Sequence, residues 1–375
     1  MLGKGKLAVL NGVKGEFEIK THDLPKIEKN TCLIKTELTG ICATDVHYWM
    51  GFKPTYEQTF PALYGHEFCG TIVELGEGYE KDYLGRPLNV GDRIIVKPQQ
   101  QCGKCYWCTT AKVPMKCETA VSYGDTGYHA PWFLGGFAEY VYICYPKGEV
   151  FKTTLDPETA MMLEPLSIAV NAINAAKQRI GDTVVVQGAG PIGLLTLACA
   201  KYYGAAKTIM VGGPENRLKI AKEFGADVVI DIDVVKDPKK RIDMILNETD
   251  NRRGADVVYE CAGFPGAVPE GIDYLRFGGT YSEAGHFANS GEVAMNPALH
   301  FCSKCIKLVG SWASTTEHFV QALAIMESRK IPISRLVTHK VPLSGLKQAF
   351  EAVASNYMLN GKEAIKIALD PWMQD

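Results

Sequence analysis

The stretch GDTVVVQGAGPIGLLTLACAKYYGAAKTIMVGG, residues 181–213, decides the fold of this chain. Thr183–Gln187 is a short, β-branched apolar run, which is typical of a buried parallel strand. It leads directly into a G-x-G-x-x-G motif at Gly188–Gly193, and a segment rich in Leu and Ala follows as far as Gly204. A lone G-x-G-x-x-G is weak evidence, but a strand before it and a helix after it are the context that a dinucleotide-binding loop requires.

Each glycine of this motif has its own expected role. Gly188 permits a tight turn, Gly190 lets the backbone approach a pyrophosphate, and Gly193 allows contact between helix and strand. The phosphates would then lie at the N-terminus of the following helix, where free N–H groups and the helix dipole favour anions. Pro191 and Ile192 therefore join the three glycines as predicted cofactor contacts.

Strand and helix patterns continue to alternate beyond the motif. The predicted elements are a strand at Thr208–Val211, a helix at Glu215–Phe224, and strands near Val228–Ile230 and Asp256–Glu260. Regular alternation of this kind indicates a parallel, doubly wound sheet, and hence an α/β fold.

The residue that would select between NAD and NADP is not evident. An acidic side chain about 20 positions beyond the glycines should hold the adenosine ribose of NAD, yet Gly212 and Gly213 occupy that strand end. Arg217 could face the 2′-phosphate of NADP, whereas nearby Glu215 would repel it. The cofactor therefore stays NAD or NADP, and we expect Gly212, Arg217 and Gly285 to contact it.

The segment QCGKCYWCTTAKVPMKC, residues 101–117, contains four cysteines: Cys102, Cys105, Cys108 and Cys117. Consecutive C-x-x-C turns let several thiolates converge, and four sulfurs suit a tetrahedral Zn²⁺ with bonds of roughly 2.3 Å. An iron–sulfur cluster uses similar spacings, but the residue after the last cysteine is a glutamate rather than the proline usual in cluster motifs. We therefore predict a closed, structural zinc site.

A second group of candidate ligands consists of Cys42, His66, Glu67 and Glu164. Glu164 stands among apolar neighbours, where a carboxylate is costly unless it is ligated or hydrogen-bonded. Taken singly, each residue has an ordinary explanation, such as a packed core histidine or a buried cysteine. Their occurrence beside a nucleotide-binding motif favours a catalytic metal site instead.

Composition and charge exclude several classes of function. The 375 residues carry 40 Lys and Arg against 42 Asp and Glu, which argues against nucleic-acid or membrane-surface partners. The first apolar run is too short for a signal-peptide core, and no stretch reaches membrane-spanning length. We expect a cytoplasmic protein, in which the twelve cysteines are thiols or metal ligands rather than disulfides.

Four motifs in combination carry a family resemblance: GHE at Gly65–Glu67, the cysteine quartet, GGFAEYV at Gly135–Val141, and GAGPIG at Gly188–Gly193. From about residue 5 to its end, the sequence resembles the zinc-dependent medium-chain alcohol dehydrogenases. Within that family it is most similar to the polyol (sorbitol-type) branch, because Glu164 stands where classical alcohol dehydrogenases have a cysteine ligand.

The resemblance implies a two-domain chain. Residues 1–164 and 306–375 would form a GroES-like, β-rich catalytic domain whose structural-zinc lobe covers about residues 98–120. Residues 165–305 would form the Rossmann nucleotide-binding domain. Members of the family form dimers or tetramers, so the resemblance also implies a homodimer or homotetramer.

The resemblance further implies two zinc ions per chain. Cys42 and His66 would hold the catalytic zinc, with Glu67 or Glu164 as a further carboxylate, while the quartet would hold the structural zinc. As a Lewis acid, the catalytic ion would lower the pKa of a substrate hydroxyl and promote hydride transfer to the nicotinamide.

A proton must also leave the substrate during oxidation. The resemblance places the hydroxyl of Thr44 at the substrate oxygen and makes His47 the base that passes the proton out. Asp45 would orient His66 through the second ring nitrogen. Glu164 is counted with Thr44 and His47 among the candidate catalytic residues.

The small-molecule alcohol or ketone substrate is less defined. Polyol enzymes place an arginine near Ala313, but this chain has Trp312 and Ser314 beside that position, which favours a smaller or less polar secondary alcohol. The alternatives are a threonine-type dehydrogenase, a zincless quinone or enoyl reductase, and a non-catalytic zinc and nucleotide sensor. The retained metal and proton-path residues argue against the last two.

Overall fold

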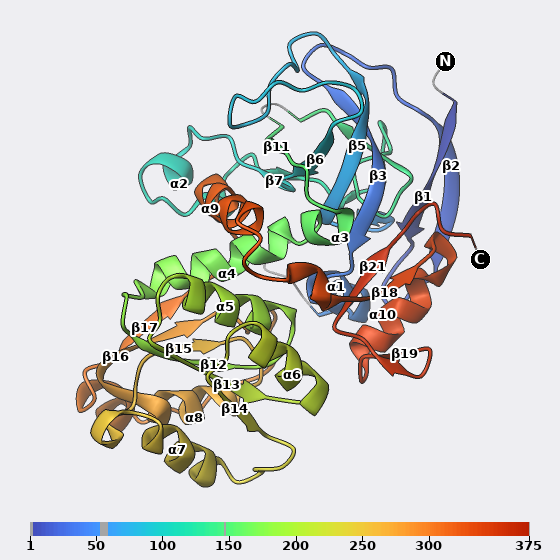
Figure 1. The fold of residues 1–375 in the computed structure, drawn as a ribbon. Helices are drawn as coiled ribbons and strands as arrows, with labels where there is room; N and C mark the ends of the chain where they lie inside the picture. Colours follow the sequence, from blue (N-terminus) through green and yellow to red (C-terminus); the bar gives the residue numbers. More distant parts are fainter. Residues whose placement is uncertain (1–2, 53–58, 146–147, 375) are drawn as a thin grey trace. The chain divides into compact units, whose positions relative to one another are not determined.

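The structure, a computed structural model, describes residues 3–52, 59–145 and 148–374 (Figure 1). The chain forms two compact units. The β-rich unit contains Met1–Glu164 and Ile333–Asp375, and the parallel-sheet unit contains Pro165–Pro332.

The parallel-sheet unit is built on six parallel strands in the order β14-β13-β12-β15-β16-β17. Its strands are β12 (Thr183–Gln187), β13 (Lys207–Gly212), β14 (Val228–Asp231), β15 (Ala255–Glu260), β16 (Leu275–Glu283) and β17 (Lys307–Gly310). Its helices are α4 (Leu163–Ala176), α5 (Pro191–Tyr202), α6 (Glu215–Glu223), α7 (Pro238–Asn247), α8 (Ala267–Tyr274) and α9 (Thr316–Glu327), with shorter turns η2 (Asp250–Arg252) and η3 (Pro297–Cys302). The expected doubly wound sheet is confirmed.

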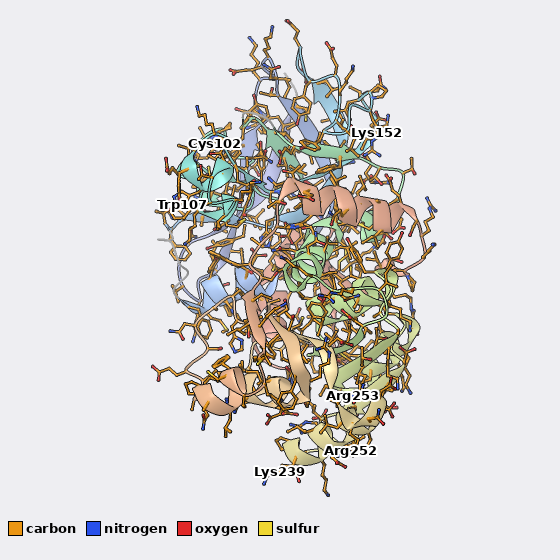
Figure 2. The ribbon with its side chains drawn as sticks, turned by 90° about the vertical axis from the view of Figure 1, so that its left-hand side faces the viewer. Cys102, Trp107, Lys152, Lys239, Arg252 and Arg253 are labelled. Atoms are coloured by element: carbon orange, nitrogen blue, oxygen red, sulfur yellow. The ribbon has the colours of Figure 1, made fainter. Side chains whose placement is uncertain are left out.

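Burial explains why these strands lack the alternation of a half-exposed sheet. Val184, Val185 and Val186 are all fully buried, because helices such as α5 and α8 lie on opposite sides of the sheet (Figure 1). A parallel sheet covered on both faces needs continuous apolar runs of this kind. At the far end of the unit, the exposed side chains of Lys239, Arg252 and Arg253 point outward (Figure 2).

The β-rich unit contains two main sheets. A four-stranded sheet has the order β2-β1-β4-β9, formed by β1 (Lys4–Leu10), β2 (Phe17–Asp23), β4 (Ala62–Tyr64) and β9 (Asp125–Gly127). A seven-stranded sheet has the order β11-β6-β5-β3-β21-β18 with β10 beside β3; its strands are β3 (Cys32–Gly40), β5 (Glu67–Leu75), β6 (Arg93–Val96), β10 (Tyr140–Ile143), β11 (Val150–Lys152), β18 (Val337–Val341) and β21 (Lys366–Leu369).

Short elements complete the β-rich unit. Two short antiparallel pairs are β7 (Gln99–Gln100) with β8 (Val121–Ser122), and β19 (Met358–Leu359) with β20 (Lys362–Glu363). The helices and helical turns are α1 (Ala43–Met50), α2 (Tyr106–Thr109), η1 (Pro114–Lys116), α3 (Pro157–Ala160), η4 (Ile333–Leu336), η5 (Leu343–Gly345) and α10 (Leu346–Ala354).

The second boundary between the units differs from the expected one. Residues 306–332 were expected in the β-rich domain but belong to the parallel-sheet unit. The reason is that β17 pairs in parallel with β16, and Nδ2 of Asn171 on α4 donates to the carbonyl of Ala313 at 2.6 Å. The chain returns to the β-rich unit only at Ile333, after which β18 pairs with β21.

Glu164 lies in the first turn of a helix. Asp156 caps the preceding helix α3 by accepting the N–H of Thr159 at 2.9 Å. The next helix, α4, begins at Leu163, so Glu164 and Pro165 both lie in its first turn. A proline needs no partner for its missing N–H in the first turn, which explains why the helix runs through it. Within the described ranges, every helix is too short or too polar to cross a bilayer.

Candidate metal and nucleotide sites

Three candidate ligands converge in the β-rich unit. Cys42, His66 and Glu67 each bring one ligand atom into a group whose members all lie within 4.8 Å of one another. Cys42 precedes α1, and His66 and Glu67 stand at the turn between β4 and β5. A thiolate, an imidazole and a carboxylate form a donor set that suits a catalytic zinc with one open position.

Local structure fixes Cys42 at the N-terminus of α1. Its Sγ accepts the backbone N–H of Thr44 at 3.4 Å, and its own N–H donates to Oδ2 of Asp45 at 3.1 Å. This is a capping box in which cysteine replaces the usual serine or threonine.

Asp45 connects this cap to His66. The Asp45 carboxylate is buried, and its Oδ1 lies 3.2 Å from Nδ1 of His66. Burial lowers the His66 pKa, but Asp45 and the Cys42 thiol outweigh it and raise the pKa well above its ordinary value. Nδ1 of His66 is therefore engaged by Asp45, which leaves Nε2 to face a metal ion.

Glu67 is buried and forms an ion pair with buried Lys366 of β21. The pair fits only because Gly40 lies opposite: a Cβ at that position would overlap Oε2 of Glu67. Lys366 balances one negative charge beside the candidate metal ligands. A buried pair of this kind holds the Glu67 carboxylate in one orientation.

Glu164 approaches the same site without joining the compact group. Burial raises its pKa to about 7; the positive charges of His66 and Lys366 lower it, and Glu67 raises it further. Within the described residues, the 4.8 Å group contains Glu67 and not Glu164. The geometry thus favours Glu67 over Glu164 as the nearer carboxylate.

Thr44 and His47 lie three residues apart on α1, and residues at this spacing share a helix face. Burial lowers the pKa of His47, so its imidazole is neutral at pH 7. The His47 ring packs against Phe52 with centroids 5.1 Å apart. By contrast, Trp49 packs into the core and donates from Nε1 to the carbonyl of Gly15 at 3.0 Å, so it is a packing residue.

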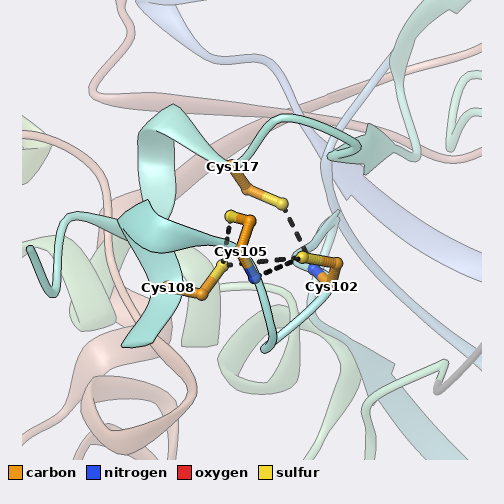
Figure 3. A group of neighbouring side chains, drawn as sticks. All are labelled: Cys102, Cys105, Cys108 and Cys117. Carbon is orange, nitrogen blue, oxygen red and sulfur yellow. Dashed lines mark hydrogen bonds between the residues drawn. The ribbon is translucent and has the colours of Figure 1, made fainter. Parts of the chain in front are cut away.

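The cysteine quartet forms a compact cage on the lobe that carries α2 (Figures 2 and 3). The sulfur atoms of Cys105 and Cys108 are 3.5 Å apart, those of Cys102 and Cys108 are 4.0 Å apart, and all four sulfurs lie within 4.8 Å of one another. A tetrahedral zinc with bonds of roughly 2.3 Å requires sulfurs about 3.8 Å apart. The spacing therefore fits a zinc ion.

Backbone N–H groups stabilise the thiolate form of one cysteine in this cage. The N–H groups of Lys104 and Cys105 donate to the sulfur of Cys102 at 3.5 and 3.4 Å and lower its pKa to about 6. Burial instead raises the pKa of Cys108 to about 12. Without a cation, therefore, the four thiols cannot all ionise together. All twelve cysteines lie in the described part of the chain, and each is a free thiol.

Lys97 is a buried cation next to the quartet that the sequence did not reveal. Its Nζ donates to the carbonyl of Gln99 at 2.6 Å and forms an ion pair with Oε2 of Glu149 at 2.7 Å. Burial lowers its pKa, whereas Glu149 and the sulfurs of Cys108 and Cys117 raise it. The lysine thus offsets negative charge beneath the cysteine cage.

The glycine-rich loop has the geometry that its sequence predicts. Gly188 has a φ of +94°, which favours glycine, and a Cβ there would lie 2.7 Å from the backbone N of Ala262. Nothing lies within 4 Å of where a Cβ of Gly190 would be, so the backbone there is open to a phosphate. A Cβ at Gly193 would overlap the carbonyl oxygen of Gly188. Pro191 and Ile192 open α5 directly behind the loop.

The remaining predicted cofactor residues lie along the carboxyl edge of the same sheet or next to it. Gly212 ends β13, Arg217 is buried in α6, and Gly285 follows β16. Asp233, which the sequence reading missed, has its Oδ2 only 2.9 Å from where a Cβ of Gly213 would be. It follows β14 rather than β13, so a search at the expected strand end could not find it.

The segment near Ala313 is held by α4. Oγ of Ser167 donates to Oγ of Ser314 at 2.8 Å, and Ala313 has a φ of +55°. Trp312 is exposed within the described structure. The positions beside Ala313 therefore carry an exposed indole and a hydroxyl already engaged in a hydrogen bond.

Comparisons with known proteins agree with this geometry. The model of the alcohol dehydrogenase GroES-like domain matches residues 28–154, and that of the zinc-binding dehydrogenase family matches residues 191–328. A sorbitol dehydrogenase of Halalkalibacterium halodurans is 35% identical over 361 residues, covering 95% of this chain and 96% of the relative.

Two further proteins extend this comparison. D-arabinitol dehydrogenase 1 of Uromyces fabae is 32% identical over 357 residues, covering 95% of this chain and 94% of the relative. The crystal structure of an alcohol dehydrogenase from Thermotoga maritima has a TM-score of 0.89 at 31% identity, covering 98% of this chain and 99% of the other.

The chain therefore belongs to the zinc-binding alcohol dehydrogenase family. It is a dehydrogenase, an oxidoreductase that uses zinc and a nicotinamide dinucleotide to oxidise an alcohol. The sensor and zincless-reductase alternatives are thereby set aside.

Proposed function

We propose that this enzyme catalyses the reversible oxidation of a secondary hydroxyl, in a small diol or polyol, to a ketone at a zinc held by Cys42, His66 and Glu67. The observation that carries the proposal is the convergence of these three ligand atoms within 4.8 Å. The matched relatives named for sorbitol and arabinitol support the substrate class.

When bound, the zinc would supply Lewis acidity that lowers the pKa of the substrate hydroxyl, and the dinucleotide would supply the hydride acceptor. The side chains of this protein do the positioning. Asp45 holds His66 in the orientation that leaves Nε2 for the ion, and Lys366 holds Glu67.

We propose that residues of α1 remove the proton from the substrate hydroxyl. We propose that the hydroxyl of Thr44 forms a hydrogen bond with the substrate oxygen. The imidazole of His47 then accepts the proton and passes it to solvent. Because burial keeps the His47 pKa below its ordinary value, the ring is a neutral acceptor at pH 7. The pKa of about 7 at Glu164 supports a second proton-holding group near the metal, which is the role we propose for it.

We propose that the cysteine cage binds a structural zinc ion. Cys102, Cys105, Cys108 and Cys117 offer no open position, so a zinc there would stabilise the lobe and take no part in chemistry.

We further propose NAD as the preferred cofactor. The Asp233 carboxylate lies beside Gly213 at the end of β13, where an adenosine ribose is held in units of this kind. Among the described residues, the exposed Asp233 side chain has no hydrogen-bond or ion-pair partner; only its backbone N–H is engaged, by Asp231. The carboxylate is therefore available to a ribose hydroxyl and would repel a 2′-phosphate.

A homodimer or homotetramer is the assembly we propose. β17 is the edge strand of the parallel sheet, and its Leu308 is exposed. An unpaired edge with an exposed apolar residue suits pairing with a second copy. Size-exclusion chromatography with light scattering measures the molar mass in solution and so tests this assembly. A monomer at micromolar concentration would contradict it.

A substrate panel tests the catalytic proposal. Polyols, small secondary alcohols and threonine are assayed with NAD and with NADP, using wild-type enzyme and the variants Cys42→Ser and Cys302→Ser. We expect polyols or diols with NAD to give the highest kcat/KM. Cys42→Ser should lose activity and one of two zinc equivalents, while Cys302→Ser, an exposed cysteine, should match wild type. A preference for threonine would favour the amino-alcohol alternative, and full activity of Cys42→Ser would reject the zinc assignment.

A further inference from the structure

A third group of potential ligands lies in the parallel-sheet unit and shares no residue with the two candidate zinc sites. Glu260 ends β15, Glu283 ends β16, and His286 follows three residues later. The two strands are parallel neighbours in which Glu260 and Glu283 are register partners. One ligand atom from each of the three residues lies within 4.8 Å of the others.

The distances within this group match metal coordination. Nδ1 of His286 lies 2.9 Å from Oε1 of Glu283 and 3.3 Å from Oε2 of Glu260. Ligands about 2.1 Å from a shared divalent ion lie roughly 3.0 to 3.4 Å from one another. The 2.9 Å contact is a hydrogen bond, and Oε1 of Glu283 also accepts the N–H groups of Gly285 and His286 at 3.1 Å each. An ion bound by the three atoms would replace the hydrogen bond between His286 and Glu283.

Glu260 is fully buried, and one of its oxygen atoms lacks a hydrogen bond. Oε1 accepts the N–H groups of Ala262 and Gly263 at 2.8 and 2.9 Å. Oε2, however, has no hydrogen-bond partner in the described structure, although it faces His286. A Cβ at Gly285 would overlap this oxygen, so the glycine keeps the space beside it open. In the described structure this oxygen makes no hydrogen bond and has an ion-pair contact with Nδ1 of His286 at 3.3 Å. A buried carboxylate oxygen that lacks a hydrogen bond is costly and is suited to binding a cation.

The two carboxylates of this group also favour the binding of a cation. Among the described ion pairs, His286 is the one basic side chain that contacts either carboxylate. Glu260 and Glu283 are register partners on neighbouring strands, so their carboxylates lie close together. A divalent cation between them would offset the repulsion of the two negative charges.

We propose that Glu260, Glu283 and His286 bind a divalent cation such as Mn²⁺ or Zn²⁺, at a third metal site of this protein. Two carboxylate oxygens and one imidazole nitrogen are ligands that both ions accept. The site adjoins the glycine-rich loop, because Ala262 contacts Glu260 and also abuts Gly188. The ion would therefore lie at the carboxyl edge of the sheet, with coordination positions left for water.

Manganese is the suitable probe, because zinc-loaded protein has its thiolate sites filled and Mn²⁺ prefers oxygen and nitrogen ligands. The full-length, zinc-loaded enzyme is titrated with Mn²⁺, and free Mn²⁺ is followed by electron paramagnetic resonance. We expect one Mn²⁺ per chain in the wild type. Glu283→Gln and His286→Gln should each weaken binding at least tenfold, whereas Glu292→Gln, an exposed acid of the following loop, should bind like wild type.

Two results would overturn the site. One is a wild type that binds no Mn²⁺ and holds no third equivalent of Zn²⁺ by elemental analysis. The other is unchanged Mn²⁺ affinity in Glu283→Gln and His286→Gln. Both side chains are partly exposed, so neither substitution is expected to prevent folding. Circular dichroism identifies a variant that does not fold, and the Mn²⁺ affinity of the other, folded variant then tests the site.

Discussion

Oδ1 of Asp45 lies 3.2 Å from Nδ1 of His66, while Oδ2 of the same carboxylate accepts the N–H of Cys42. One buried side chain thus contacts both the thiol residue and the imidazole of the proposed catalytic zinc site. It connects a helix start to a strand turn that lies more than twenty positions further along the chain.

We expect Asp45→Asn to weaken zinc binding at the catalytic site about 10- to 100-fold and to lower kcat/KM with it. The amide is similar in size, but it no longer supplies the negative charge that fixes the His66 ring. Competition with a chromogenic chelator measures the affinity. Asp23→Asn, at an exposed position, is the control. Unaltered zinc affinity in Asp45→Asn would show that the contact has no part in metal binding.

The pH profile of alcohol oxidation tests His47. Its folded pKa is below the ordinary 6.5, so the ring accepts protons above that pKa and loses this ability as the pH falls through it. Wild-type kcat/KM should therefore decline on the acidic side, as the pH falls through this lowered pKa. His47→Gln should be at least tenfold slower at pH 7 and should lack that acidic limb. An acidic limb identical in the variant would assign the titration to another group.

Removing one ligand of the cysteine cage should cost stability rather than chemistry. We expect Cys105→Ser to lose the structural zinc and to lower the thermal midpoint by several degrees, because metal binding at such sites contributes folding free energy. Scanning calorimetry and zinc analysis provide the readouts, with Cys302→Ser as the matched control. A variant that retains two zinc ions and the wild-type midpoint would mean that the cage is not a metal clamp.

Cofactor preference should respond to Asp233. Asp233→Asn removes the charge at nearly constant size, and we expect the ratio of kcat/KM for NAD to that for NADP to fall at least fivefold. In contrast, Gly212→Asp should impair folding, because a Cβ there would lie 2.8 Å from the backbone N of Ala189. A constant ratio in Asp233→Asn would place ribose selection elsewhere.

The sequence predicted the features that local patterns encode. The strand Thr183–Gln187, the helix after Gly193 and the four clustered cysteines have strong short-range signals, and the structure contains them. The boundary near residue 306 was wrong because it depends on β17 pairing with β16, which is a long-range choice. The order of strands in a sheet has no signature within a short window.

The same limit applies to side chains that meet across strands. Glu260 and Glu283 are separated by 22 residues of chain, and only the register of β15 against β16 brings them together. Asp233 approaches Gly213 for a similar reason, since β13 and β14 are parallel neighbours. The sequence did not distinguish Glu67 from Glu164 as the carboxylate ligand of the catalytic zinc. Only the packing of the folded chain shows that Glu67 lies nearer to Cys42 and His66.

The sulfur of Cys42 caps the N-terminus of α1 and is also a ligand of the proposed metal site. Demetallation should therefore loosen the first turn of α1. Amide hydrogens of that turn would then exchange faster with deuterium in the apoenzyme than in the holoenzyme. Since His47 lies on the same helix, zinc loss would also disorder the proton path that we propose through this residue.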